Sequence, residues 1–168
     1  ARTDGILKAF PEEGRQVTTI TDERGQASVL FQLGTRTGAG NNQVAVTSSG
    51  VVGEVMFCAS ATVGPPAQIN ADAVMGEHFR AIAGASLPAP FVTIVLDASG
   101  NPVASVPVTF RVVGGAGTLE GAATVTKSTD TDGKAAALLT LGEEEGKTVV
   151  SASFEGLAGA PVYFARWT

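Results

Sequence analysis

An internal repeat constrains the fold of this chain more than any other feature of its sequence. Residues 18–34 read TTITDERGQASVLFQLG, and residues 126–142 read TKSTDTDGKAAALLTLG, so that Gly25 aligns with Gly133 at an offset of 108. Eight of these 17 aligned pairs are identical, which shared composition does not explain. After a turn the similarity continues at an offset of 106, where Phe57 aligns with Tyr163. Two copies of one structural unit are therefore expected.

The two copies differ in extent. The second copy has an upstream part at about residues 66–113, whereas residue 1 already corresponds to a point near the middle of the repeated unit. The chain also begins without an initiator Met, which favours a fragment or a processed product. The expected division has three parts: the C-terminal half of one module at residues 1–62, a stiff proline-containing linker at 63–66, and a complete module at 67–168.

Short strands separated by turns fill the second copy. Residues 91–96 are rich in β-branched side chains, and in residues 106–112 apolar and polar positions alternate, with Val106, Val108, Phe110 and Val112 on one face. Asp130-Thr131-Asp132-Gly133 has the pattern of a hairpin turn. Residues 135–141 are expected to form one strand, and residues 84–89 could form a short helical turn. The pattern predicts an all-β sandwich with Greek-key connections.

Several short motifs resemble one known family. They are Asp97-Ala98-Ser99-Gly100-Asn101-Pro102, Val106-Pro107-Val108-Thr109-Phe110, Gly115-Ala116-Gly117-Thr118-Leu119 and Thr129-Asp130-Thr131-Asp132-Gly133. In these motifs the chain resembles the bacterial immunoglobulin-like domain of group 1, the invasin and intimin type of repeat. The resemblance implies an immunoglobulin-like β-sandwich in a bacterial surface protein, where such domains are spacers that carry a binding domain away from the cell.

Charge and composition argue against several other classes of protein. The net charge is −5, and the 11 Lys and Arg residues are scattered, so nucleic acid is an unexpected partner. No apolar run approaches the ~20 residues that would span a bilayer. The only cysteine, Cys58, is expected to be a small buried side chain in a strand, and His78 is the only histidine. This set is too small for a catalytic triad or a zinc site, so we expect neither enzymatic activity nor a cofactor.

The turn at Asp130 and Asp132 has two interpretations, one of which is a calcium-binding site. Two carboxylates separated by one residue before a glycine resemble the start of a calcium loop, but no glutamate follows at the required spacing. The first copy has Arg24 in place of the second aspartate, and its charge would repel a cation. Ordinary turn chemistry is therefore the preferred interpretation, with weak calcium binding as the alternative.

The sequence favours a structural or adhesive repeat module of a secreted or cell-surface protein, acting as a spacer or assembly unit. The alternative is a module that recognises a glycan or a protein through the loops at one end of the sandwich. Trp167 is the only tryptophan, and it could form part of such a binding surface or pack against a neighbouring domain.

Half a sandwich would leave an apolar sheet face uncovered and a strand edge open, and both favour association. We therefore expect other strands to complete the first module. They could come from a neighbouring module or another copy of the chain by strand exchange, from a different protein partner, or from the remainder of a longer or cleaved parent chain. Such pairing could give a homo-oligomer or a filament. The residues expected to line this interface are Val29, Phe31, Leu33, Val44, Val46, Val55 and Phe57.

Overall fold

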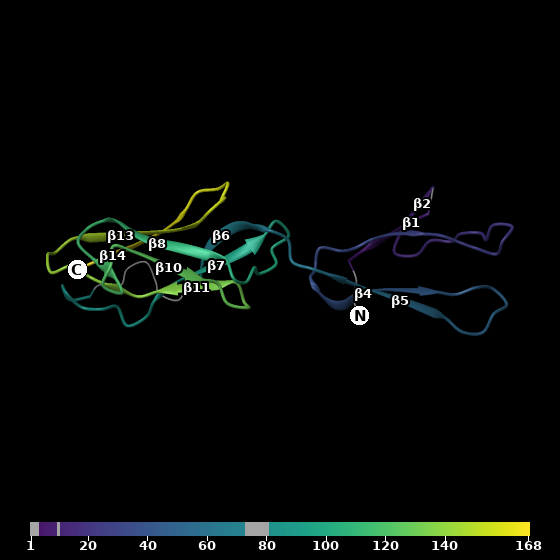
Figure 1. Cartoon of the computed structure of the whole chain (residues 1–168), viewed down its shortest axis with the longest axis horizontal. Helices are drawn as coiled ribbons and strands as arrows, with labels where there is room; N and C mark the ends of the chain where they lie inside the picture. The colour runs from purple at the N-terminus through teal and green to yellow at the C-terminus, as the bar shows by residue number, and fades with distance from the viewer. Residues whose placement is uncertain (1–3, 10, 73–80) are drawn as a thin grey trace. The chain divides into compact units, whose positions relative to one another are not determined.

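The computed structural model describes residues 4–9, 11–72 and 81–168 (Figure 1). The chain divides into two compact units, Ala1–Val63 and Gly64–Thr168. All regular structure in the described ranges is antiparallel strand, and no helix occurs in them. The predicted all-β class is therefore confirmed.

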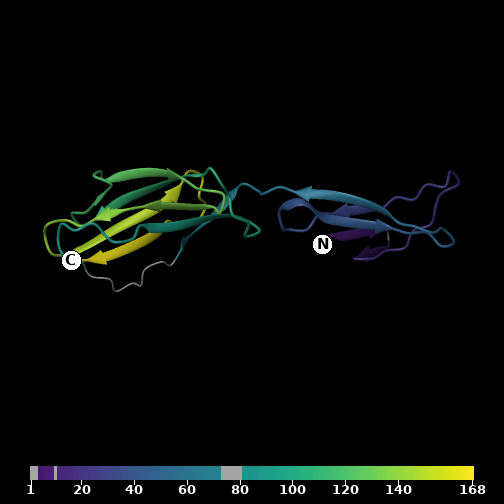
Figure 2. The same cartoon turned by 90° about the horizontal axis from the view of Figure 1, so that it is seen from below.

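The second unit has two main sheets. The larger sheet has the strand order β10-β8-β13-β14, and the smaller sheet has the order β11-β7-β6. The strands of the larger sheet are β8 (Pro107–Gly114), β10 (Thr124–Ser128), β13 (Lys147–Phe154) and β14 (Val162–Trp167). Those of the smaller sheet are β6 (Pro66–Asp72), β7 (Phe91–Asp97) and β11 (Lys134–Ala137). Two short strands, β9 (Thr118–Leu119) and β12 (Leu139–Thr140), pair with each other as a separate ladder. Figure 2 shows the strands of the second unit, coloured from teal to yellow, from a second direction.

Alternating side chains of both sheets form one core. Val95 on β7, Val108 and Phe110 on β8 and Val150 on β13 are completely shielded from solvent. Val112 is partly buried and packs against the same cluster. The predicted apolar face of residues 106–112 is therefore confirmed, and the closed arrangement is the predicted immunoglobulin-like sandwich.

Two local predictions for the second unit are wrong. Residues 84–89 form no helical turn, because Ser86 bridges to Thr140 and the Leu87 N–H donates to the carbonyl of Leu139. Residues 135–141 are not one strand: β11 pairs with β7, whereas β12 pairs with β9. The chain changes partner at Leu138, so a single continuous ladder is not formed.

Asp97 holds together the turn after β7 and the start of the second unit. Its Oδ1 accepts hydrogen bonds from the backbone N–H groups of Ser99 and Asn101, at 2.8 and 2.9 Å. Its Oδ2 accepts from the N–H of Gly64 at 3.0 Å and from the side-chain amide of Asn101 at 2.9 Å. The carboxylate is almost completely buried, and these bonds, with the Asn101 side chain foremost, lower the pKa of Asp97 to about 2.

Replacing Asp97 with alanine is expected to lower the free energy of unfolding of the second unit by about 2 kcal/mol at neutral pH. The pKa of the folded carboxyl lies below that of an unfolded aspartate, so this stabilisation is complete above a pH of about 4 and is lost as the pH falls towards 2. Urea unfolding followed by Trp167 fluorescence checks the prediction. Wild type and variant should converge in acid, and a difference that persists at low pH would contradict it.

The first unit has fewer paired strands. A three-stranded sheet has the order β2-β1-β3, and β4 pairs with β5. The bounds are β1 (Ile6–Ala9), β2 (Glu12–Gly14), β3 (Leu30–Gln32), β4 (Gly38–Val46) and β5 (Val55–Ala61). Of the described residues in this unit, only Gly5 and Asn42 are buried. It therefore has no closed core comparable to that of the second unit.

Asp4 ties the start of this unit to the segment after β3. The N–H and Oγ1 of Thr35 both donate to Oδ2 of Asp4 at 2.9 Å. These hydrogen bonds, chiefly that from the Thr35 hydroxyl, hold the pKa of Asp4 below its ordinary value.

The central turn of the repeat has the same hydrogen bonds in both units. Asp22 Oδ1 accepts from the N–H groups of residues 24 and 26, and Asp130 Oδ1 accepts from those of residues 132 and 134, all at 2.8–2.9 Å. The backbone bonds that close the turn are also equivalent. The glycines that follow have φ values of 75° at Gly25 and 72° at Gly133. The sequence repeat is thus a repeat of local geometry.

The strands on either side of this turn also correspond. A Cβ on Gly117 would lie 3.0 Å from Leu139 Cδ1, and a Cβ on Gly5 would lie 2.6 Å from Phe31 Cε2. Leu119 pairs with Leu139 in the second unit, as Leu7 pairs with Phe31 in the first. In geometry β1 therefore corresponds to β9, and β3 corresponds to β12.

The register of the last two strands corrects the sequence alignment by one residue. Val150 pairs with Phe164 across β13 and β14, and Val44 pairs with Phe57 across β4 and β5. Phe57 therefore occupies the position of the inward-facing Phe164, not that of Tyr163. The alignment was wrong here because the turn between these strands is one residue shorter in the first unit.

Candidate functional site

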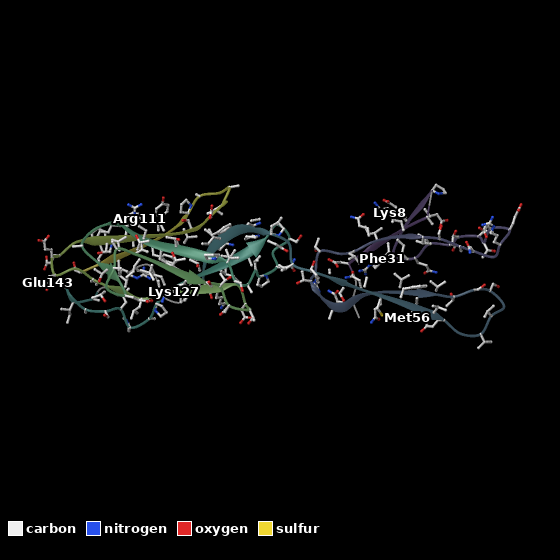
Figure 3. The ribbon with its side chains drawn as sticks, viewed as in Figure 1. Lys8, Phe31, Met56, Arg111, Lys127 and Glu143 are labelled. Atoms are coloured by element: carbon white, nitrogen blue, oxygen red, sulfur yellow. The ribbon has the colours of Figure 1, made fainter. Side chains whose placement is uncertain are left out.

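Apolar residues gather on one face of the β4–β5 hairpin. Val44 pairs with Phe57 and Val46 pairs with Val55, and directly paired residues of antiparallel strands point to the same side. Val44 also lines an open cavity of about 260 Å³ together with Leu7 and Phe31 of the other sheet. We call the surface formed by Leu7, Phe31, Val44, Val46, Val55 and Phe57 the acceptor face. Figure 3 shows Phe31 on the side of its sheet towards the hairpin, and Met56 on the opposite side of β5.

The acceptor face is open where the second unit is closed. Phe57 is 60% exposed, Val55 59% and Val46 48%, whereas Val150 and Ala152, the counterparts of Val44 and Val46, are completely buried. In the second unit strands β7 and β8 shield these positions. Within the described part of the first unit, no strand corresponds to β6, β7 or β8.

Two further residues predicted for the interface lie beside this face. Val29 and Leu33 alternate with Phe31 along the chain, and they are 38% and 40% exposed. Their counterparts by the repeat, Ala137 and Leu141, are almost completely buried. All seven residues predicted for the interface are thus apolar positions that the solvent reaches at least in part.

Trp167 lies on an exposed sheet face, not among the end loops. Trp167 and Tyr163 occupy alternate outward positions of β14, and they are 48% and 61% exposed. Lys147 pairs with Trp167, and its Nζ lies 5.6 Å from the centroid of the indole ring. Arg111 on β8 and Tyr163 both pair with Ser151, so Arg111 lies on the same face (Figure 3). We call Arg111, Lys147, Tyr163 and Trp167 the aromatic–cationic face; sequence reasoning found only its tryptophan.

The two aspartates considered for calcium have a clear structural role in the turn. Oδ1 of Asp130 accepts from the N–H groups of Asp132 and Lys134, both at 2.9 Å. Lys134 Nζ lies 2.6 Å from Asp72 Oδ2, which brings a cation to the same edge. Over the residues that the structure describes, no three His, Cys, Asp or Glu side chains are grouped as metal ligands.

The remaining candidate residues have ordinary surroundings or lie outside the described residues. Cys58 is exposed, so the prediction that it is buried was wrong. It pairs with Gln43, one position out of phase with Val44 and Phe57, and it therefore points away from the acceptor face. His78 lies outside the described residues. A search of the described ranges found no helix with the length and hydropathy needed to cross a bilayer.

Known proteins provide an independent comparison. The bacterial Ig-like domain (group 1) family matches residues 74–164, more than half of the 168-residue chain. The D00-D0 domain of intimin is 17% identical with a TM-score of 0.46, over 98% of this chain and 77% of that chain. Domains 4 and 5 of the S-layer protein SbsC are 12% identical with a TM-score of 0.43, over 99% of this chain and 98% of that chain.

A β-glucuronidase of glycoside hydrolase family 2 is 13% identical with a TM-score of 0.46, over 96% of this chain but only 17% of the enzyme. No match was found among curated proteins. The family match extends over most of the closed sandwich, including β7, β8 and the Asp130 turn. The chain belongs to the bacterial Ig-like domain (group 1) family.

Proposed function

We propose that this chain is a structural repeat unit of a bacterial surface protein, a spacer or assembly module that performs no catalysis. The observation that carries the proposal is the use of polar side chains inside the second unit. Asp97 binds four backbone and side-chain donors of its own sandwich. Thr129 accepts from the N–H of Val106 and donates to the carbonyl of Val103. These hydrogen bonds hold the segments between strands in place, which a spacer under tension requires.

The proposal extends to the partner and the location. The exposed acceptor face supports assembly with a protein segment, either a neighbouring module or another copy of the chain. An acidic surface and a sandwich of this family are consistent with an extracellular position or one on the cell surface. In this view residues 1–62 are the C-terminal half of a module, residues 63–66 are a linker and residues 67–168 are a whole module.

A spacer should resist extension as one cooperative unit. When the chain is pulled from its two ends in a force experiment, we expect the second unit to unfold in one event. That event should release roughly 350–380 Å of chain, because about 105 residues each extend by ~3.3–3.6 Å. The first unit should extend at lower force without an event of its own. Gradual extension of the second unit at low force would contradict the proposed role.

The aromatic–cationic face supports a second function, recognition of an acidic protein partner. Trp, Tyr and Arg are the side chains that contribute most often to binding energy at protein interfaces. Here they share one sheet face with Lys147, on a chain whose net charge is −5. The binding residues of this second function lie on the face of a sheet, not in the end loops that the sequence suggested.

Replacing Tyr163 and Trp167 together with alanine is expected to reduce binding to bacterial or host-cell surfaces by at least about tenfold, with the circular dichroism spectrum unchanged. The matched control is Thr126→Ala on β10, an exposed residue on the same side of the sheet that is not one of the four residues of the aromatic–cationic face. Equal binding by the wild type and the double variant would rule out this second function.

A further inference from the structure

We infer that the aromatic–cationic face binds the turn Glu143-Glu144-Glu145 of a second copy of this chain, so that two second units associate face to face about a two-fold axis. We call these three glutamates the acidic turn. The inference rests on the second proposed function, recognition of an acidic protein partner, and it names that partner.

The acidic turn lies at the same end of the sheet as Lys147 and Trp167. It comes directly before β13, which begins at Lys147, and Figure 3 shows Glu143 at the end of the second unit. The N–H of Gly146 donates to Oγ1 of Thr168 at 2.6 Å, and the N–H of Thr168 donates to the carbonyl of Gly146 at 3.1 Å. These bonds hold the turn beside the end of β14, so little ordering is needed when it binds.

The charges of the acidic turn and of the aromatic–cationic face are not neutralised within one copy. The three glutamates are exposed, as are Arg111 and Lys147. Among the residues that the structure describes, no ion pair includes any of these five side chains. An interface with two-fold symmetry uses the same patch on both copies, so that patch must carry both of the complementary charges. The second unit meets this requirement.

The spacing of the charges along β13 fits a two-fold axis. Glu144, the middle of the acidic turn, comes three residues before Lys147. Arg111 lies opposite Ser151, which comes four residues after Lys147. At ~3.3 Å per residue, these groups lie at most about 10 Å before Lys147 and about 13 Å after it. A two-fold axis that crosses the strands at Lys147 therefore brings each acidic turn opposite Arg111 of the other copy.

The aromatic side chains lie where this axis would pass. Trp167 pairs with Lys147, and Tyr163 lies two outward positions further along β14. They are 48% and 61% exposed in one copy, and association would cover both. Interfaces between proteins commonly have an aromatic centre and a charged rim, and this arrangement has both.

A second copy fits this face better than an unrelated acidic protein. The acidic turn is the only run of three consecutive acidic residues in the sequence. By symmetry each contact between the turn and Arg111 occurs twice, so two modest surface contacts add together. Such pairing would link neighbouring copies side by side on a cell surface, which specifies the proposed assembly role.

The test measures the dissociation constant of the full 168-residue chain by sedimentation equilibrium. Arg111→Glu and Glu144→Lys each bring like charges together twice in a symmetric dimer, and each alone should weaken association by at least about tenfold. An equimolar mixture of the two variants should restore association, because the reversed charges then lie opposite each other. Glu155→Lys is the matched control: it makes the same charge change at an exposed residue just after β13, at the other end of the sheet, and should have no effect.

Trp167 fluorescence separates this interface from association through any other surface. Trp167 is the only tryptophan, and its indole should leave water when the two faces meet. Its emission should therefore shift to shorter wavelength as the wild-type concentration rises, and Arg111→Glu should suppress the shift.

Three outcomes would overturn the inference: a wild-type chain that stays monomeric, a dimer that Arg111→Glu and Glu144→Lys leave intact, or a mixture of these variants that fails to associate. The second proposed function is judged separately. If the wild type stays monomeric while the double replacement of Tyr163 and Trp167 still abolishes binding to cell surfaces, the face recognises a different acidic protein and this inference is wrong.

Discussion

Replacing Phe110 with alanine is expected to destabilise the second unit by about 4 kcal/mol. The Phe110 ring is completely buried, so its removal leaves a cavity that the surrounding residues cannot fill by rearranging. Phe110 lies on β8 between β10 and β13, so its ring contacts the centre of the core. Trp167 is the only tryptophan and lies in the same unit, so urea unfolding followed by its fluorescence reports this unit alone.

The matched control for this substitution is Phe57→Ala in the first unit. The Phe57 side chain is 60% exposed, so its removal should change the stability of the first unit by less than about 1 kcal/mol. Because Trp167 fluorescence does not report this unit, the measurement is hydrogen exchange at the amides of β4 and β5. A comparable loss for both variants would show that the first unit has a closed core of its own. That result would contradict the open acceptor face.

Replacing Gly133 with alanine is expected to cost the second unit about 3 kcal/mol. Two effects combine: a φ of 72° is unfavourable for a residue with a Cβ by about 1–2 kcal/mol, and the new Cβ would lie 2.7 Å from the carbonyl oxygen of Val95. Neither that backbone carbonyl nor Val103, 3.1 Å from the same position, can rotate away. Thermal unfolding of the variant should show a clearly lower midpoint than wild type.

Gly25→Ala is the counterpart of this substitution in the first unit. Its φ is nearly the same, but no described atom lies within 4 Å of its Cβ position. We expect only the conformational cost of about 1–2 kcal/mol. If the two alanine variants lost equal stability, the contact of β7 with the turn would contribute nothing, and the difference in packing between the two turns would have no effect on stability.

The elements that local sequence patterns determine were predictable. Residues 106–112 alternate in polarity, and Asp130 to Gly133 has turn chemistry, so strand β8 and the hairpin followed from neighbouring residues alone. Because the repeat aligns Asp22 with Asp130, a turn at Asp22 was also predictable. Both signals act within a few residues, which is the range over which a sequence pattern constrains the backbone.

Features that depend on distant partners were not predictable. Asp97 was read as part of a turn, but one of its donors is Gly64, which is 33 residues away. The division of residues 135–141 between β11 and β12 depends on two different partner strands. The outward direction of Cys58 follows from the one-residue difference in turn length, and an alignment at a fixed offset misses that difference.

The candidate surfaces were predictable to different degrees. Apolar residues alternate along residues 29–33 and 44–46, and alternate residues of a strand share a side, so Phe31, Val44 and Val46 of the acceptor face were predictable. Leu7 was missed, because only the pairing of β1 with β3 brings it beside Phe31. The pairing that brings Arg111, Lys147 and Tyr163 to the face of Trp167 depends on the register of three strands. Nothing in the local sequence specifies that register, so only the tryptophan stood out.

Hydrogen exchange on the unmodified chain tests the central claim most directly, because it compares a closed unit with an open one in the same sample. The amides of Val95, Val106 and Thr129 are all hydrogen-bonded inside the second unit, and they should exchange only on its global unfolding. The amides of residues 27–29, which lie outside any strand of the first unit, should exchange at rates close to those of an unfolded chain. Equal strong protection in both units, with the chain monomeric, would contradict the account, because residues 1–63 would then form a closed core of their own.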